Sequence, residues 1–188
     1  RDVERSRGLG DVYKRQPVTR EAPANTVEVP FTHDLGKGGT EVKNYTDINV
    51  NGDNRKWLYG TSNGYAACMV PNADDVNAND DWLITVPIHL PSGSYVLSFE
   101  IGIMGSGSPS VSMDASIGKT PTVEGLTTQV VAPLTHTVKD MTPYEYGVTI
   151  DEEGYYYIGF HCTTTKAQKG TLKLANVGML SLIHISEP

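Results

Sequence analysis

The sequence is short of the residues that build helices, nucleic-acid interfaces and disulfide frameworks. Its 188 residues include only two cysteines, and 15 Lys and Arg stand against 22 Asp and Glu, a formal net charge of -7. Nucleic-acid-binding domains usually carry a basic patch, so this acidic balance argues against nucleic acid as a partner. No apolar run approaches the roughly 18 residues of a membrane span, and we expect no membrane insertion by this domain. Two cysteines are also too few for a disulfide framework.

Glycine, proline and tyrosine are instead well represented, at 19, 11 and 10 residues. Leu, Ala and Glu are comparatively few, and this balance favours strands and turns over helices. Apolar side chains recur at every second position in several short segments, for example at Tyr95, Leu97, Phe99 and Ile101. That period is typical of strands with one buried face. The sequence therefore predicts an all-β chain, an antiparallel β-sandwich with at most one or two short helical turns.

About eleven short strands are predicted, separated by turn residues rich in Gly, Asn, Asp and Pro. They cover residues 27–31, 46–50, 56–59, 65–70, 82–90, 95–101, 110–117, 128–132, 146–150, 156–162 and 171–180. Pro87 lacks a backbone N–H, so we expect it to interrupt its strand at a sheet edge or a bulge. The one helical turn is predicted at residues 122–126.

The two ends of the chain differ from its body. DVYKRQ at residues 11–16 and SLIHISEP at residues 181–188 resemble translated adapter read-through peptides. We therefore expect residues 1–16 and 181–188 to be artefactual or disordered tails that do not belong to the fold. Residues 17–26 are expected to form a linker, and residues 27–180 the folded domain.

Several ordered segments in the body carry a family resemblance. Asp80 begins the stretch DDWLITVPIHL, residues 119–127 read KTPTVEGLT, Gly154 begins GYYYIGFH, and residues 172–177 read LKLANV. In this order and at this spacing they resemble the choice-of-anchor J and cleaved-adhesin domains. One departure is Ala175, where that family usually has Asp.

The resemblance extends over about residues 27–180. It implies a MAM-like jelly roll that serves as one module of a larger secreted or surface-anchored bacterial protein. The implied function is non-catalytic binding or adhesion at the cell surface or outside the cell. The implied partners are a glycan or a host or matrix protein, together with neighbouring domains of the same polypeptide. A structural spacer and an independent hydrolase remain as alternatives.

The loop at residues 47–53 has the pattern of a metal site. Asp47, Asn49, Asn51 and Asp53 place oxygen side chains at alternate positions, and Gly52 permits a tight turn. This matches the first half of a calcium loop, although the Glu that would complete an EF-hand is absent. The family resemblance likewise implies calcium binding at an acidic loop before a Trp. The alternative is an Asn-Gly turn whose side chains bond their own backbone.

Two further acidic positions are candidate ligands that could complete a calcium shell. Asp34 follows the first predicted strand, and Asp80 begins the DDWLITVPIHL stretch. Closely spaced carboxylates repel one another unless a cation or solvent intervenes. A solvated acidic surface is the competing interpretation of both positions.

Aromatic residues offer candidate contacts to a sugar, because a ring face stacks against the C–H face of a pyranose. The candidates for ligand binding are Trp57, Tyr59, Tyr65, Tyr144 and Tyr146. No catalytic residues are predicted, since no nucleophile elbow and no zinc-binding His spacing occurs in the sequence.

Cys68 and Cys162 each lie in a predicted strand, Cys162 on its apolar face. A secreted setting permits a disulfide between them, whereas buried free cysteines pack as small apolar side chains. The packing argument favours two buried thiols, and the sequence leaves the question open.

Overall fold

Thirteen β-strands and two short 3-10 helices make up the part of the chain that this computed structural model describes, residues 21–36, 38–60, 62–72 and 76–182. The strands are β1 Val27–Glu28, β2 Phe31–His33, β3 Thr46–Asn49, β4 Trp57–Leu58, β5 Ala66–Cys68, β6 Asp81–Ile84, β7 Ile88–Leu90, β8 Gly93–Met104, β9 Val111–Gly118, β10 Thr128–His136, β11 Thr142–Ile150, β12 Gly154–Cys162 and β13 Thr171–Ser181. The 3-10 helices are η1 Glu41–Asn44 and η2 Lys166–Gln168. The predicted all-β class is confirmed.

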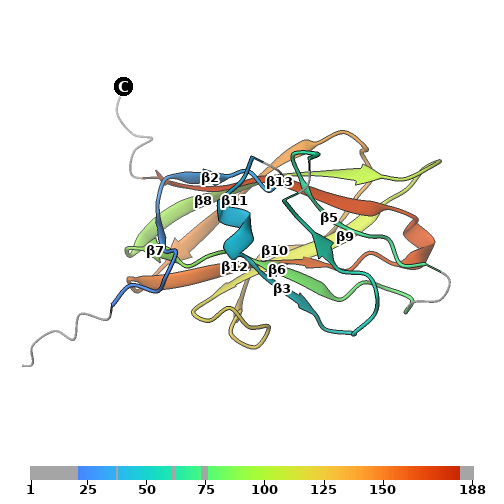
Figure 1. The fold of residues 1–188 in the computed structure, drawn as a ribbon. Helices are drawn as coiled ribbons and strands as arrows, with labels where there is room; N and C mark the ends of the chain where they lie inside the picture. The colour runs from blue at the N-terminus through green and yellow to red at the C-terminus, as the bar shows by residue number, and fades with distance from the viewer. Residues whose placement is uncertain (1–20, 37, 61, 73–75, 183–188) are drawn as a thin grey trace, which may run out of the picture.

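The strands form two sheets that face each other (Figure 1). In the seven-stranded sheet, β12 pairs with β9 on one side and with β7 and β6 on the other. In the six-stranded sheet, β13 pairs with β8 on one side and with β5 and β2 on the other. All pairs are antiparallel except the short parallel pair of β1 with β7. A long strand thus lies at the centre of each sheet, and its neighbours in the sheet are not its neighbours in the sequence.

The inner faces of the two sheets make the hydrophobic core. In β8, Tyr95, Leu97, Phe99 and Ile101 are buried, and the residues between them are half-buried. In β12, Phe160 meets Phe99 edge-on, with ring centroids 5.3 Å apart and an interplanar angle of 73°. The predicted strand faces are therefore confirmed, and the two central phenylalanines join the sheets.

The predicted interruption at Pro87 is also confirmed, although neither half of this segment is an edge strand. β6 and β7 flank the break and both pair with β12. Thr85 bridges the break, since its N–H donates to the Ile158 carbonyl and its Oγ1 accepts from the Ile158 N–H, at 2.9 and 3.0 Å. A side-chain hydroxyl therefore replaces the missing ladder bond.

Two elements differ from the prediction in more than their bounds. The first strand is two strands, because β1 joins the seven-stranded sheet and β2 joins the six-stranded sheet, with Pro30 between them. Residues 122–126 form a hydrogen-bonded turn and no helix, with Gly125 N–H donating to Thr122 O at 3.1 Å. The predicted tails lie largely outside the described residues, and β13 continues to Ser181.

Candidate functional site

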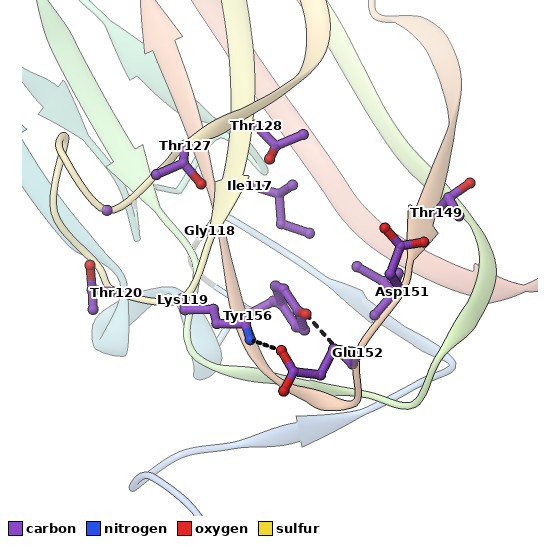
Figure 2. Close-up of a pocket in the computed structure, with 12 residues that line it drawn as sticks. Ile117, Gly118, Lys119, Thr120, Thr127, Thr128, Thr149, Asp151, Glu152 and Tyr156 are labelled. Carbon is purple, nitrogen blue, oxygen red and sulfur yellow. Dashed lines mark hydrogen bonds and ion pairs between the residues drawn. The ribbon is translucent and has the colours of Figure 1, made fainter.

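A pocket of about 600 Å³ opens beside the last residues of β9 and β11 and the first residues of β12. Its floor is apolar and consists of Ile117, Ile150 and the ring of Tyr156, of which Ile117 and Ile150 are almost fully buried. Its rim is polar. Figure 2 shows Thr127 and Thr128 on one side of Tyr156, and Thr149 and Asp151 on another. An apolar floor therefore lies beneath a ring of hydroxyl and carboxylate groups.

Two opposite charges close one side of this pocket. Lys119 Nζ lies 2.7 Å from Glu152 Oε2, and the Tyr156 hydroxyl donates to the Glu152 carbonyl at 2.7 Å (Figure 2). The hydrogen bond to the Glu152 carboxylate raises the pKa of Lys119, and the same contact lowers the pKa of Glu152. Both groups therefore stay charged over the neutral range, and the Lys119 ammonium also lies 5.6 Å from the Tyr156 ring centroid.

The loop after β9 is held against the outer face of its own sheet, which places Lys119 and Thr127 at the pocket. Leu126 packs against Trp82, the side chain that β6 presents on that outer face. At the base of the loop, a Cβ on Gly118 would lie 1.8 Å from the Gly125 carbonyl oxygen. Only glycine therefore permits this close approach of the two ends of the loop.

The predicted aromatic set is not one surface. Trp57 is 1% exposed and its Nε1 donates to the Asp81 carbonyl at 3.1 Å, so it is a core residue and its prediction as a ligand contact is wrong. Tyr59 packs partly against the core, and Tyr65 is half-buried beneath Lys173, whose Nζ lies 5.2 Å from its ring centroid.

Tyr144 and Tyr146 do lie together on β11. Their rings are nearly parallel, with centroids 6.4 Å apart, and each also stacks against Phe99. The Tyr144 hydroxyl is 2.9 Å from His136 Nδ1 on β10. Both tyrosines are half-buried in this stack, so they close the edge of the sandwich more than they offer open ring faces.

The amides of the predicted calcium loop are bonded within the protein. Asn49 Oδ1 accepts from Gly52 N–H at 2.8 Å, and its Nδ2 donates to the Asp53 carbonyl at 2.8 Å. Asn51 Oδ1 accepts from Asp53 N–H at 3.2 Å, and its Nδ2 donates to the Ala78 carbonyl at 3.1 Å. These two side chains therefore shape the loop, as the Asx-turn alternative expects.

Around the loop, three carboxylates and one amide instead carry buried oxygens that lack a hydrogen-bond partner among the described residues. Asp47 Oδ1, Asp53 Oδ2, Asn79 Oδ1 and Asp81 Oδ1 are all buried and have no hydrogen-bond partner among the described residues. Asp81 is fully buried. Burial, opposed by a hydrogen bond from Asn79 and reinforced by the charges of Asp53 and Asp47, raises its pKa to about 6. Buried, unpartnered oxygens of this kind are costly unless a cation or a proton satisfies them.

The two outlying acidic candidates lie apart from this cluster. Asp34 Oδ1 accepts from Gly36 N–H at 2.7 Å. Asp80 Oδ1 is 2.8 Å from His161 Nε2, while Asp114 Oδ2 is 3.1 Å from the other ring nitrogen. His161 also stacks on Trp82 with centroids 4.2 Å apart, on the outer face of the sheet. Asp80 therefore belongs to a histidine clamp, and its neighbour Asp81 takes the inward position.

Among the residues that the structure describes, no three His, Cys, Asp or Glu side chains are already gathered as a metal site. Asp47, Asp53 and Asp81 are close enough for their charges to interact. Their oxygens, with the Asn79 carbonyl, are the hard ligands that calcium prefers. The donor set thus fits calcium in chemistry.

The sequence did not single out the pocket or Asp81. Lys119 and Glu152 are separated by 33 positions, and only the folding of β9 and β11 to the same end brings them together. Asp81 follows Asp80 directly, and the pattern alone does not say which of the two faces inward. Side chains alternate between the two faces of β6, so Asp81 and Leu83 lie on the face opposite Trp82. Once Trp82 is placed on the outer face, Asp81 must face inward.

Comparison with known proteins identifies the fold. No protein-family model and no curated protein matches the chain. Among solved structures, the K1 and K3 cleaved adhesin domains of Lys-gingipain from Porphyromonas gingivalis W83 are similar, with TM-scores of 0.61 and 0.58 and 16% identity for both. The alignments cover 81% and 80% of this chain and 98% of each domain.

A xylan-binding CBM22-2 domain of Xyn10C from Paenibacillus barcinonensis is also similar, with a TM-score of 0.50 and 11% identity. That alignment covers 80% of this chain and 98% of the domain.

Within the described residues, none of the helices has the length and apolar character needed to cross a bilayer. The comparisons and the two facing sheets together establish the fold of this chain as a jelly-roll β-sandwich.

Proposed function

We propose that this chain is a non-catalytic glycan-binding module and that the pocket of Figure 2 holds a sugar residue of a neutral polysaccharide. The observation that supports this best is the apolar floor of Ile117, Ile150 and Tyr156 beneath a polar rim. A pyranose has the same division, with apolar C–H faces and hydroxyls around its edge. The pocket volume of about 600 Å³ also lies within the range of about 300–1,000 Å³ that is typical of small-ligand sites.

The rim supplies both the hydrogen-bond donors and the hydrogen-bond acceptors that sugar hydroxyls need. Threonine hydroxyls donate and accept, the Asp151 carboxylate accepts, and the Lys119 ammonium donates. Lys119 and Glu152 already neutralise each other across 2.7 Å, which leaves the Asp151 charge at the rim. A uronic acid or a sulfated sugar would bring a second negative charge to this rim, so a neutral glycan is favoured.

The charge state of Glu152 argues against Glu152 as the acid of a hydrolase at this pocket. A glycosidase needs one carboxylic acid that stays protonated near neutral pH, and such an acid has a raised pKa. Lys119 lowers the pKa of Glu152 instead. Glu152 is therefore suited to accept hydrogen bonds and unsuited to donate a proton to a leaving group.

We propose an extracellular or cell-surface setting for this module, within a larger polypeptide. The similar structures are themselves named as single domains of larger proteins, an adhesin domain of Lys-gingipain and a xylan-binding domain of Xyn10C. A host or matrix protein as ligand, or a spacer role without any ligand, is the competing outcome of the binding experiment below.

The binding experiment uses the whole chain and a panel of soluble neutral polysaccharides, including xylan, β-glucan, galactan and mannan, in affinity electrophoresis and calorimetry. We expect binding to at least one polymer, and at least a tenfold loss of affinity in Asp151→Ala and in Lys119→Ala. Glu145→Ala, an exposed glutamate of β11 that does not line the pocket, is the matched control and should bind normally. No binding to any polymer, or equal binding by all variants, would overturn the proposal.

We also propose that calcium binds among Asp47, Asp53 and Asp81 and stabilises the fold, with the Asn79 carbonyl as a further ligand. The support is the set of four buried oxygens that lack partners among the described residues. Calcium would supply positive charge to carboxylates that otherwise repel one another. Asn49 and Asn51, whose oxygens are already bonded, would hold the loop in shape around the ion.

A further inference from the structure

The two cysteines of the chain come from opposite sheets. Cys68 ends β5 of the six-stranded sheet, and Cys162 ends β12 of the seven-stranded sheet. Both are fully buried and belong to the same core cluster, so both side chains project into the space between the sheets.

Asp81 ties the two positions together. It is the cross-strand partner of Cys162 in the pairing of β6 with β12. Its carboxylate reaches across the core to Cys68, where Sγ lies 3.8 Å from Oδ2. The two thiols, free in the structure, are therefore neighbours.

We propose that Cys68 and Cys162 are a site of oxidation, and that they form a disulfide between the two sheets when the domain folds in an oxidising compartment. An inter-sheet disulfide at the centre of a β-sandwich is geometrically feasible, as immunoglobulin domains show. In the reduced state both cysteines pack as small apolar side chains, and the fold does not depend on the bond.

The oxidant is a disulfide, either that of an oxidoreductase or a small-molecule disulfide. The thiolate of one cysteine attacks it, forms a mixed disulfide and releases one thiol. The thiolate of the second cysteine then attacks the protein sulfur of the mixed disulfide and releases the second thiol. Two protein thiols are oxidised and one external disulfide is reduced to two thiols. Neither sulfur is exposed in the folded domain, so the exchange takes place before the sandwich closes.

The bond would close a long loop, since nearly a hundred residues separate the two cysteines. On the chain-entropy account such a loop gives several kcal/mol, which for a domain of this size is a rise in Tm of roughly 10 °C. The stabilisation acts on the unfolded chain, so it does not depend on the glycan pocket.

The test refolds the whole chain with a mixture of reduced and oxidised glutathione and then alkylates it in denaturant. We expect an intact mass lower by the two hydrogens lost, no alkylation of either cysteine, and a Tm that falls by roughly 10 °C on reduction. A variant with Cys68→Ala and Cys162→Ala should have a Tm that reductant does not change. Alkylation of both cysteines in denaturant after oxidative refolding would overturn the proposal. Because alkylation and mass are read on the natural sequence, the test does not require the variant to fold.

Discussion

At the scale of single residues, the fold depends on a few side chains that lie between the sheets. Phe160 is fully buried and meets Phe99 from the opposite sheet. Around them, Tyr144 and Tyr146 stack against Phe99 and close the edge of the sandwich. Removal of any one of these rings would leave a space that both sheets line.

Phe160→Ala should therefore lower the free energy of unfolding by about 3–5 kcal/mol, through lost burial and the cavity that remains. Urea denaturation followed by tryptophan fluorescence measures this loss. Tyr155→Ala, a half-buried neighbour on the same strand, is the control and should cost much less. A loss below 1 kcal/mol for Phe160→Ala would mean that the core does not depend on this ring.

Buried histidine makes stability depend on pH. His33 is 3% exposed, its Nδ1 lies 2.9 Å from the Tyr45 hydroxyl, and burial lowers its pKa although Glu41 acts in the opposite direction. The unfolded chain, with a pKa of about 6.5, takes up a proton that the folded state resists. Stability contributed by His33 is therefore present above pH 6.5 and lost as the pH falls through the lowered pKa.

His33→Gln should accordingly reduce the stability lost between pH 7.5 and pH 5.5, as measured by urea denaturation at both values. His89 is the control of opposite sign, because hydrogen bonds to Glu28 and Glu153 raise its pKa. Its contribution is present below pH 6.5 and lost as the pH rises. The hypothesis fails if His33→Gln loses as much stability on acidification as the unaltered protein.

At the scale of elements, the strands were predictable and their partners were not. Period-two alternation identified β8 and β12 with their buried faces, because each is long and has one face in the core. β4 has two residues, so no period exists to show that Trp57 is buried. β11 begins at Thr142, earlier than predicted. The sequence pattern missed its first residues because Pro143 lies among them, and a proline argues against a strand.

The predicted calcium loop shows the same limit. Its alternating oxygens are visible in the sequence, yet Asn49 and Asn51 use theirs to hold the backbone. The third carboxylate of the proposed site comes from Asp81 on β6, whose strand pairs with β3. A pairing between distant segments of the chain is set by the whole sheet, so local spacing could not supply this residue.

The calcium proposal predicts a shift in thermal stability. An ion bound only by the folded state, at a hundredfold excess over its Kd, adds about 2.7 kcal/mol. The Tm should therefore be higher in millimolar calcium than in chelator, and Asp53→Ala should remove most of this difference. Asp34→Ala, outside the cluster, should retain it. Equal melting with calcium and with chelator, and no heat on titration of stripped protein, would contradict the proposal.

At the scale of the whole molecule, β12 connects two regions with different chemistry. Its residue Tyr156 lies in the pocket, and Cys162 at its end pairs with Asp81 of the acidic cluster. Six residues of extended strand separate these positions by about 20 Å. The pocket and the acidic cluster are thus too far apart to share a side chain.

Substitutions in the two regions should therefore be additive. The free energies of unfolding lost in Lys119→Ala and in Asp53→Ala should sum, within about 0.5 kcal/mol, to the loss in the double variant. The affinity of Asp53→Ala for the polysaccharide should equal that of the unaltered protein at temperatures well below its Tm. A coupling larger than 1 kcal/mol would show that the two ends of β12 communicate.

This separation along one strand bears on how such a domain can evolve. Substitutions in the loop after β9 and in the turn between β11 and β12 reach the pocket without touching the carboxylates near β3 and β6. The proposed sugar site can therefore diversify while the proposed calcium site at the opposite end stays unchanged. Lineages that descend from this domain should vary in the first region and keep the second.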